Sequence, residues 1–128
     1  MAQNIAVKKI LVVDDEPDIT ISIKTGLEKK GFSVSIYNEP MKALSDFKPN
    51  VYDLLLIDIR MPKMNGFELY REIKKKSSDV KICFFTAFEV YYDEFRKMFP
   101  SLEVKCFIRK PITINDLVTH INSELEKN

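Results

Sequence analysis

Residues 9–17 have the sequence Lys9-Ile-Leu-Val-Val-Asp-Asp-Glu-Pro17, and this stretch decides the fold. Its apolar, β-branched half predicts a short strand that is buried on both faces of a sheet. Three acids follow at the carboxyl end of that strand, and Pro17 suits the first turn of a helix. The helix continues toward Gly31 through apolar residues at helical spacing, namely Ile19, Ile23 and Leu27. The first unit of the chain is therefore a strand followed by a helix.

The same alternation continues to the end of the chain. Apolar or alternating runs predict four more strands, at Phe32–Tyr37, Leu54–Ile57, Lys81–Phe85 and Val104–Ile108. Helical spacing of apolar residues predicts four more helices, which begin near Pro40, Phe67, Phe88 and Ile114. Strands and helices that alternate through short connections predict an α/β fold, in which helices cover both faces of an open parallel sheet.

Length and composition limit the classes of protein that remain. The chain has 128 residues, 45% hydrophobic and 30% charged, which fits one soluble globular domain and leaves no room for a second. We expect a short extension at residues 1–8 and a single domain over residues 9–126. The net charge of +1 gives no bulk field toward nucleic acid or an anionic membrane, so we expect neither as a direct partner. Residues 1–9 are polar and mixed, with no apolar stretch before a small-residue cleavage site, and no uncharged run approaches membrane-spanning length. We therefore expect a cytoplasmic location.

The two cysteines carry little functional signal in the sequence. Cys83 and Cys106 each lie in an apolar, strand-like run, and they lack the close spacing of a metal-binding or redox pair. We expect both to be buried free thiols, in a core that needs no disulfide.

Polar residues collect at one edge of the predicted sheet. Parallel α/β sheets bind ligands outside the carboxyl ends of their strands, and this edge gathers Asp14, Asp15, Asp58, Thr86 and Lys110. Carboxylates brought together would repel one another without a cation, and hard oxygen ligands suit Mg²⁺. The three acids sum to −3, while Mg²⁺ and the lysine sum to +3. Taken singly, the acids could be ordinary helix-start residues and the lysine a surface residue. Together they favour a phosphoryl-transfer site.

A set of short motifs has a fixed order along the chain: Asp14-Asp15, Asp58, Met61-Pro62, Gly66, Thr86-Ala87 and Lys110-Pro111. In residue type, order and spacing they resemble the response-regulator receiver domain of two-component signalling, from about Lys9 to Glu126. The resemblance implies a flavodoxin-like sheet of order 2-1-3-4-5 with five helices. It also implies that Asp58 accepts a phosphoryl group from a histidine kinase or phosphotransfer protein. Such a domain catalyses only its own phosphorylation and hydrolysis, so we do not expect an enzyme.

The resemblance assigns further roles. Mg²⁺ would bind Asp14, Asp15, Asp58 and the backbone carbonyl of Arg60, while Thr86 and Lys110 would bind the phosphoryl oxygens. A cis peptide is implied between Lys110 and Pro111.

The resemblance also assigns a switch. Phe107 matches an aromatic residue that turns inward when Thr86 moves toward the phosphoryl group. This changes the surface of the fourth helix, fifth strand and fifth helix, where a downstream protein would bind. The many aromatic residues of the predicted helix at Phe88–Phe99 favour such docking, or a homodimer.

Two positions depart from the common receiver pattern. Arg60 stands two residues after Asp58, and Phe88 two after Thr86, where receivers tune the access of water to the acyl phosphate. The Arg60 guanidinium would pair with an acid of the pocket or a phosphoryl oxygen, and the Phe88 ring would shield the acyl phosphate. We therefore predict slow self-dephosphorylation.

Three alternatives stay open from the sequence. A Mg²⁺-dependent phosphatase with an aspartyl-phosphate intermediate also has an aspartate after a parallel strand, but its second acid is replaced here by Arg60. A phosphorylation-independent binding module would keep the fold and lose the chemistry. Occupation of the metal pocket by Arg60 would favour this alternative. A flavodoxin-like FMN protein would need a phosphate-binding loop after the first strand, where Asp14, Asp15 and Glu16 would repel phosphate.

Overall fold

The computed structural model describes residues 6–87, 93, 97 and 106–127. The described elements are β1 (Lys9–Val13), α1 (Pro17–Lys29), β2 (Ser33–Tyr37), α2 (Pro40–Asp46), β3 (Leu54–Asp58), α3 (Gly66–Lys76), β4 (Lys81–Thr86), β5 (Phe107–Arg109) and α5 (Ile114–Leu125). The helix predicted at Phe88–Phe99 lies outside the described residues, except for Asp93 and Lys97. The last strand differs from its prediction, because Cys106 precedes it and Arg109 ends it.

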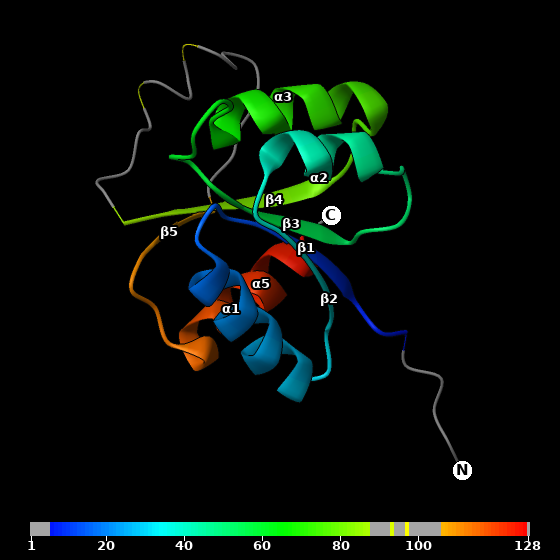
Figure 1. The fold of residues 1–128 in the computed structure, drawn as a ribbon. Coiled ribbons are helices and arrows are strands. Elements are labelled where there is room, and N and C mark those ends of the chain that lie inside the picture. Colours follow the sequence, from blue (N-terminus) through cyan, green and yellow to red (C-terminus); the bar gives the residue numbers. More distant parts are fainter. Residues whose placement is uncertain (1–5, 88–92, 94–96, 98–105, 128) are drawn as a thin grey trace.

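The strands form one parallel sheet in the order β2-β1-β3-β4-β5, which confirms the flavodoxin-like topology. Helices α2 and α3 cover one face of the sheet, and α1 and α5 cover the other (Figure 1). Because all the pairings are parallel, the carboxyl ends of the strands lie at the same edge. Because β1 and β3 lie in the middle of the sheet, the acids that follow or end them are brought side by side.

The two central strands contribute to both halves of the core. Alternate residues point to opposite faces, so that Leu55 and Ile57 pack under α2 and α3, while Leu54 and Leu56 pack under α1 and α5. Every residue of β3 is buried, as expected for a strand covered on both sides. This packing explains why the sequence of the strand is wholly apolar until Asp58.

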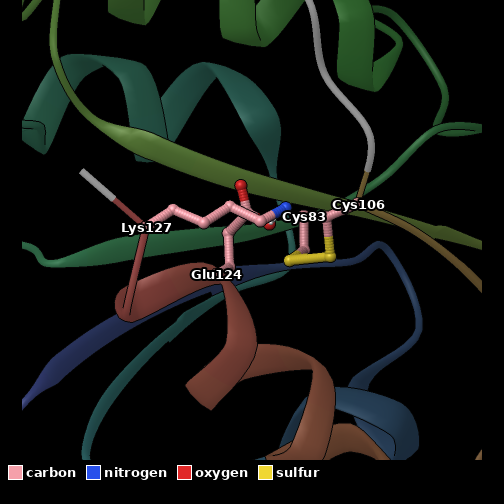
Figure 2. The surroundings of a disulfide bond; sticks show 4 residues. All are labelled: Cys83, Cys106, Glu124 and Lys127. Atoms are coloured by element: carbon pink, nitrogen blue, oxygen red, sulfur yellow. Dashed lines mark hydrogen bonds and ion pairs between the residues drawn. A yellow bond between two sulfur atoms is a disulfide. The ribbon is translucent and has the colours of Figure 1, made fainter.

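The prediction of free thiols is wrong, because Cys83 and Cys106 form a disulfide. Strands β4 and β5 pair in parallel with Phe84 opposite Phe107, which brings the preceding cysteines together with their Cα atoms 4.7 Å apart. Figure 2 shows the bond beside Glu124 and Lys127, near the carboxyl end of α5. Both cysteines are buried, as predicted. Their pairing depends on strand register, which spacing along the chain does not reveal.

None of the described helices combines the length and the apolar character that crossing a lipid bilayer requires.

Candidate functional site

The structure gathers the predicted polar residues at the carboxyl edge of the sheet. Asp14 follows β1, Asp58 ends β3 and Thr86 ends β4, and all three are buried. Asp15 is half-buried beside them, and Lys110 follows β5. Buried polar side chains at adjacent strand ends are unusual unless they serve one another or a ligand. The structure thus brings these predicted residues together at the predicted edge of the sheet, while their roles stay predictions.

Lys110 brings a positive charge into this pocket. Its Nζ lies 2.6 Å from Oδ2 of Asp14 and 3.6 Å from Oδ2 of Asp58, and only 11% of its side chain is exposed. The ammonium also lies 4.5 Å from the centre of the Phe85 ring. The backbone N–H of Lys110 donates to the carbonyl of Thr86 at 2.8 Å, which ties the ends of β4 and β5 together. The bond between Lys110 and Pro111 is cis, which confirms the prediction.

Asp58 has the most perturbed acid–base behaviour at the site. Burial and, after it, the negative charge of Asp14 raise the pKa of Asp58 to about 7. The Lys110 ammonium and a hydrogen bond from the backbone N–H of Arg60 oppose this rise without cancelling it. One ammonium therefore does not neutralise the pocket, and a further cation would favour the ionised carboxylate.

Carboxylate oxygens are concentrated at the end of β1. Asp14, Asp15 and Glu16 each offer an oxygen, and these oxygens lie within 4.8 Å of one another. Such hard donors are those that Mg²⁺ prefers. Together with the raised pKa of Asp58, this donor set fits a divalent cation. Glu16 was not among the predicted ligands, although the run of three acids contained the signal.

The start of α3 lies very close to the backbone of Asp58. Asn65 caps the helix by accepting from the N–H of Glu68, while the Glu68 carboxylate accepts from the N–H of Asn65. The N–H of Gly66 donates to the carbonyl of Ile59 at 2.8 Å. A Cβ on Gly66 would stand 2.3 Å from the carbonyl oxygen of Asp58, so only glycine fits without a shift of the backbone. This glycine holds the helix against the end of β3.

The residues predicted to tune or switch the site are placed as follows. Arg60 is exposed, and the ammonium bound to Asp14 belongs to Lys110. Phe107 is half-buried and stacks on Phe84, with ring centres 5.6 Å apart. Phe88 lies outside the described residues.

Asn38 is a residue near the site that sequence reasoning missed. It follows β2, the strand next to β1, and donates its side-chain amide to the carbonyl of Asp14 at 2.8 Å. Asn38 and Asp15 also line the same open cavity of about 390 Å³. The available signal was a polar residue just after a predicted strand, the same signal that identified Asp14.

Comparison with known proteins agrees with this geometry. The Response regulator receiver domain family matches residues 10–122. The chain belongs to that family. The Response regulator SaeR of Staphylococcus aureus is 30% identical over 118 residues, which cover 92% of this chain and 50% of SaeR. The chain thus spans about half the length of the curated relatives it matches.

Solved receiver structures have the same fold. A CheY-like response regulator receiver domain from Methanospirillum hungatei superposes with a TM-score of 0.83 at 29% identity, covering 94% of this chain and 95% of the other. The non-phosphorylated receiver domain of HemR from Leptospira biflexa gives a TM-score of 0.82 at 27% identity, covering 94% and 96%. These likenesses confirm that the chain is a response-regulator receiver domain.

Proposed function

We propose that Asp58 accepts a phosphoryl group from a phosphohistidine on a sensor histidine kinase or a phosphotransfer protein. One observation carries this proposal: a buried carboxylate stands at the end of the central strand, with the Lys110 ammonium 3.6 Å away. An oxygen of Asp58 attacks phosphorus while the bond from phosphorus to the imidazole nitrogen breaks, and that nitrogen keeps the electron pair. Asp58 must be ionised to attack, which its pKa of about 7 allows near neutral pH.

Charge neutralisation is the main task of the surrounding residues in this reaction. Phosphoryl transfer depends on positioning and electrostatic stabilisation more than on covalent assistance. Lys110 and the hydroxyl of Thr86 would bind oxygens of the incoming group, and their backbones are already joined by a hydrogen bond. Lys110 contacts Asp14 before phosphorylation, so it can move toward the phosphoryl oxygens without leaving the pocket.

Mg²⁺ is the cation that we propose for this pocket. Asp14, Asp15, Asp58 and the backbone carbonyl of Arg60 would hold it, and Glu16 is close enough to bind a water of its shell. When bound, the ion supplies positive charge to the phosphoryl oxygens.

We propose that the signal leaves the site through Thr86 and Phe107. Movement of Thr86 toward the phosphoryl group would free space in the core, and the Phe107 ring, stacked on Phe84, would turn to fill it. The changed face would bind a downstream protein or a second copy of the chain.

The exchange with a kinase would take place in the cytoplasm. We further propose that the domain acts on no external substrate.

Arg60 and Phe88 are proposed to slow hydrolysis of the acyl phosphate. Arg60 is exposed and lies two residues after Asp58, and its charge would attract a phosphoryl oxygen. Replacing either residue by alanine should shorten the lifetime of the acyl phosphate, as followed by mass spectrometry after removal of the phosphodonor. An unchanged or longer lifetime in both variants contradicts this role.

Intact-protein mass spectrometry with a small-molecule phosphodonor tests the proposal. We expect a single phosphoryl adduct that requires Mg²⁺ and disappears in Asp58→Asn. The control is Asp79→Asn, which removes an exposed carboxylate from the opposite end of β4 and should keep the adduct. An adduct that persists in Asp58→Asn contradicts the assigned acceptor. If neither a phosphodonor nor a histidine kinase modifies the chain, the binding module becomes the better hypothesis.

A further inference from the structure

The side chain of Asn38 joins three elements around the acidic residues. Its Nδ2 donates to the backbone carbonyl of Asp14 at 2.8 Å and to Oγ1 of Thr20 at 2.9 Å. Thr20 lies in α1 and is completely buried, and its hydroxyl donates in turn to the carbonyl of Pro17 at 3.1 Å. The end of β2, the end of β1 and the first turn of α1 are thus connected by one chain of hydrogen bonds.

The direction of each bond in this chain is determined by chemistry. A backbone carbonyl can only accept, so the atom of Asn38 that faces Asp14 must be the amide nitrogen. The Thr20 hydroxyl uses its hydrogen toward Pro17, which leaves its oxygen to accept from Asn38. Both hydrogens of the Asn38 amide are therefore used, and an oxygen in their place would face two acceptors.

These bonds fix the peptide plane that carries the acidic pair. The N–H of Asp14 donates to the carbonyl of Tyr37 at 3.1 Å, and its carbonyl accepts from Asn38. Because a peptide unit is planar, fixing the carbonyl of Asp14 also fixes the N–H and the Cα of Asp15. Asp15 lines the same cavity as Asn38, so the bonds of Asn38 restrict the backbone from which the Asp15 carboxylate reaches that cavity.

We propose that Asn38, held by Thr20, is a positioning residue that sets the orientation of Asp14 and Asp15 for binding a divalent cation. This inference rests on the proposed Mg²⁺ site and adds residues that touch neither the ion nor the phosphoryl group. Groups that orient the ligands of a metal affect its affinity strongly, because the ligands otherwise sample unproductive directions.

Graded substitutions test the proposal. Asn38→Leu has a similar size and removes both donors, so we expect the Kd for Mg²⁺ to rise about tenfold. Thr20→Val keeps the bond to Asp14 but loses the support of the asparagine, for which we expect about a threefold rise. Thr20→Ser restores the hydroxyl and should bind Mg²⁺ as the wild type does. The Kd is measured by Mg²⁺ titration of the amide NMR signals of the pocket.

A second variant separates positioning from general loss of stability. Ile121→Val removes one methylene from the buried face of α5, away from the acids, and should lower stability while leaving the Kd for Mg²⁺ unchanged. In Asn38→Leu, by contrast, excess Mg²⁺ should recover most of the lost rate of phosphorylation by a small-molecule phosphodonor.

The outcomes distinguish this inference from the proposed function. If the wild type binds Mg²⁺ and Asn38→Leu binds it equally well, the positioning role is overturned and the metal site stands. Thr20→Ser binding as weakly as Thr20→Val also overturns it. If the wild type itself binds no Mg²⁺, the metal site fails, and the positioning role fails with it.

Discussion

The two sides of the pocket are held together by different kinds of bond. On the side of β1 and β3, fully paired strands end in the buried acids Asp14 and Asp58, which Lys110 contacts from the end of β5. On the side of β4 and β5, the last strand has three residues, and a disulfide joins it to its neighbour. Both sides have backbone hydrogen bonds, but the first side adds ion pairs and the second adds a covalent bond.

Because of this difference, the two sides suit different tasks: the first suits binding, and the second suits movement over a fixed base. The raised pKa of Asp58 makes the charge at the end of β3 sensitive to pH near neutrality, and the proposed cation would bind at this end. The disulfide lies three residues before Thr86 along β4, which corresponds to about 10 Å of strand. It fixes the base of the strand pair and leaves the ends, with Thr86 and Lys110, dependent on weaker contacts. The strand ends that are proposed to move are therefore attached to a base that the disulfide holds in place.

Removing the charge of Asp58 should have the largest effect on the free energy of unfolding. This effect should come only from the side of the pocket formed by β1 and β3. Without metal, burial and the charge of Asp14 raise the pKa of Asp58 from 3.8 to about 7. The folded protein then binds more protons than the unfolded chain between these values, so the free energy of unfolding falls as pH rises from about 4 to about 7. The shift corresponds to about 4 kcal/mol. Asp58→Asn should abolish this fall and be more stable than wild type at pH 8.

Urea unfolding at several pH values, with a chelator present, measures this effect. Asp79→Asn serves as the control, because its exposed carboxylate lies outside the pocket and the wild-type pH profile should persist. An Asp58→Asn variant that loses stability with pH as steeply as the wild type would show that another group causes the dependence.

Breaking the disulfide should have the next largest effect, and on the other side of the pocket. The bond closes a loop with a sequence separation of 23, and loss of such a constraint on the unfolded chain costs about 3 kcal/mol. Thermal unfolding with and without a dithiol reductant measures the loss. The variant with both Cys83→Ala and Cys106→Ala should not respond to the reductant. The pH profile should keep its shape in reduced protein, because the two largest causes of the raised pKa of Asp58 are its burial and the charge of Asp14. A changed profile would mean that the disulfide also affects the position of Lys110, which follows β5 and contacts both acids.

The sequence allowed the fold and most of the pocket to be predicted, for physical reasons. Apolar runs that stop at Asp14 and Asp58 identify buried strands and, through the parallel arrangement, the edge where their acids meet. The disulfide was not predictable in this way, because it depends on the register of two strands that are distant in sequence. The bond from Asn38 to Asp14 depends on the direction of one side chain, and the pKa of Asp58 depends on its burial. Neither quantity follows from residue spacing.

Gly66→Ala should give the smallest of these changes in stability, and it tests the side of the pocket formed by β1 and β3. The added Cβ would meet the backbone carbonyl of Asp58 at 2.3 Å, which cannot yield without moving β3 or α3. We expect a loss of about 2 kcal/mol in urea unfolding and a lower rate of phosphorylation, because Asp58 shifts.

Gly26→Ala is the matched control for this substitution. Its Cβ would also come close to another group, at 2.5 Å, but that group is the side chain of Ile114 and not the backbone, so it can yield by a shift of one side chain. Alanine is also favoured over glycine inside a helix by about 1 kcal/mol, so the net change should be smaller than about 1 kcal/mol. Equal losses in the two variants would mean that crowding alone sets the cost. A larger loss of stability in Gly66→Ala, accompanied by slower phosphorylation, would show that the side formed by β1 and β3 depends on the close approach of α3 to Asp58.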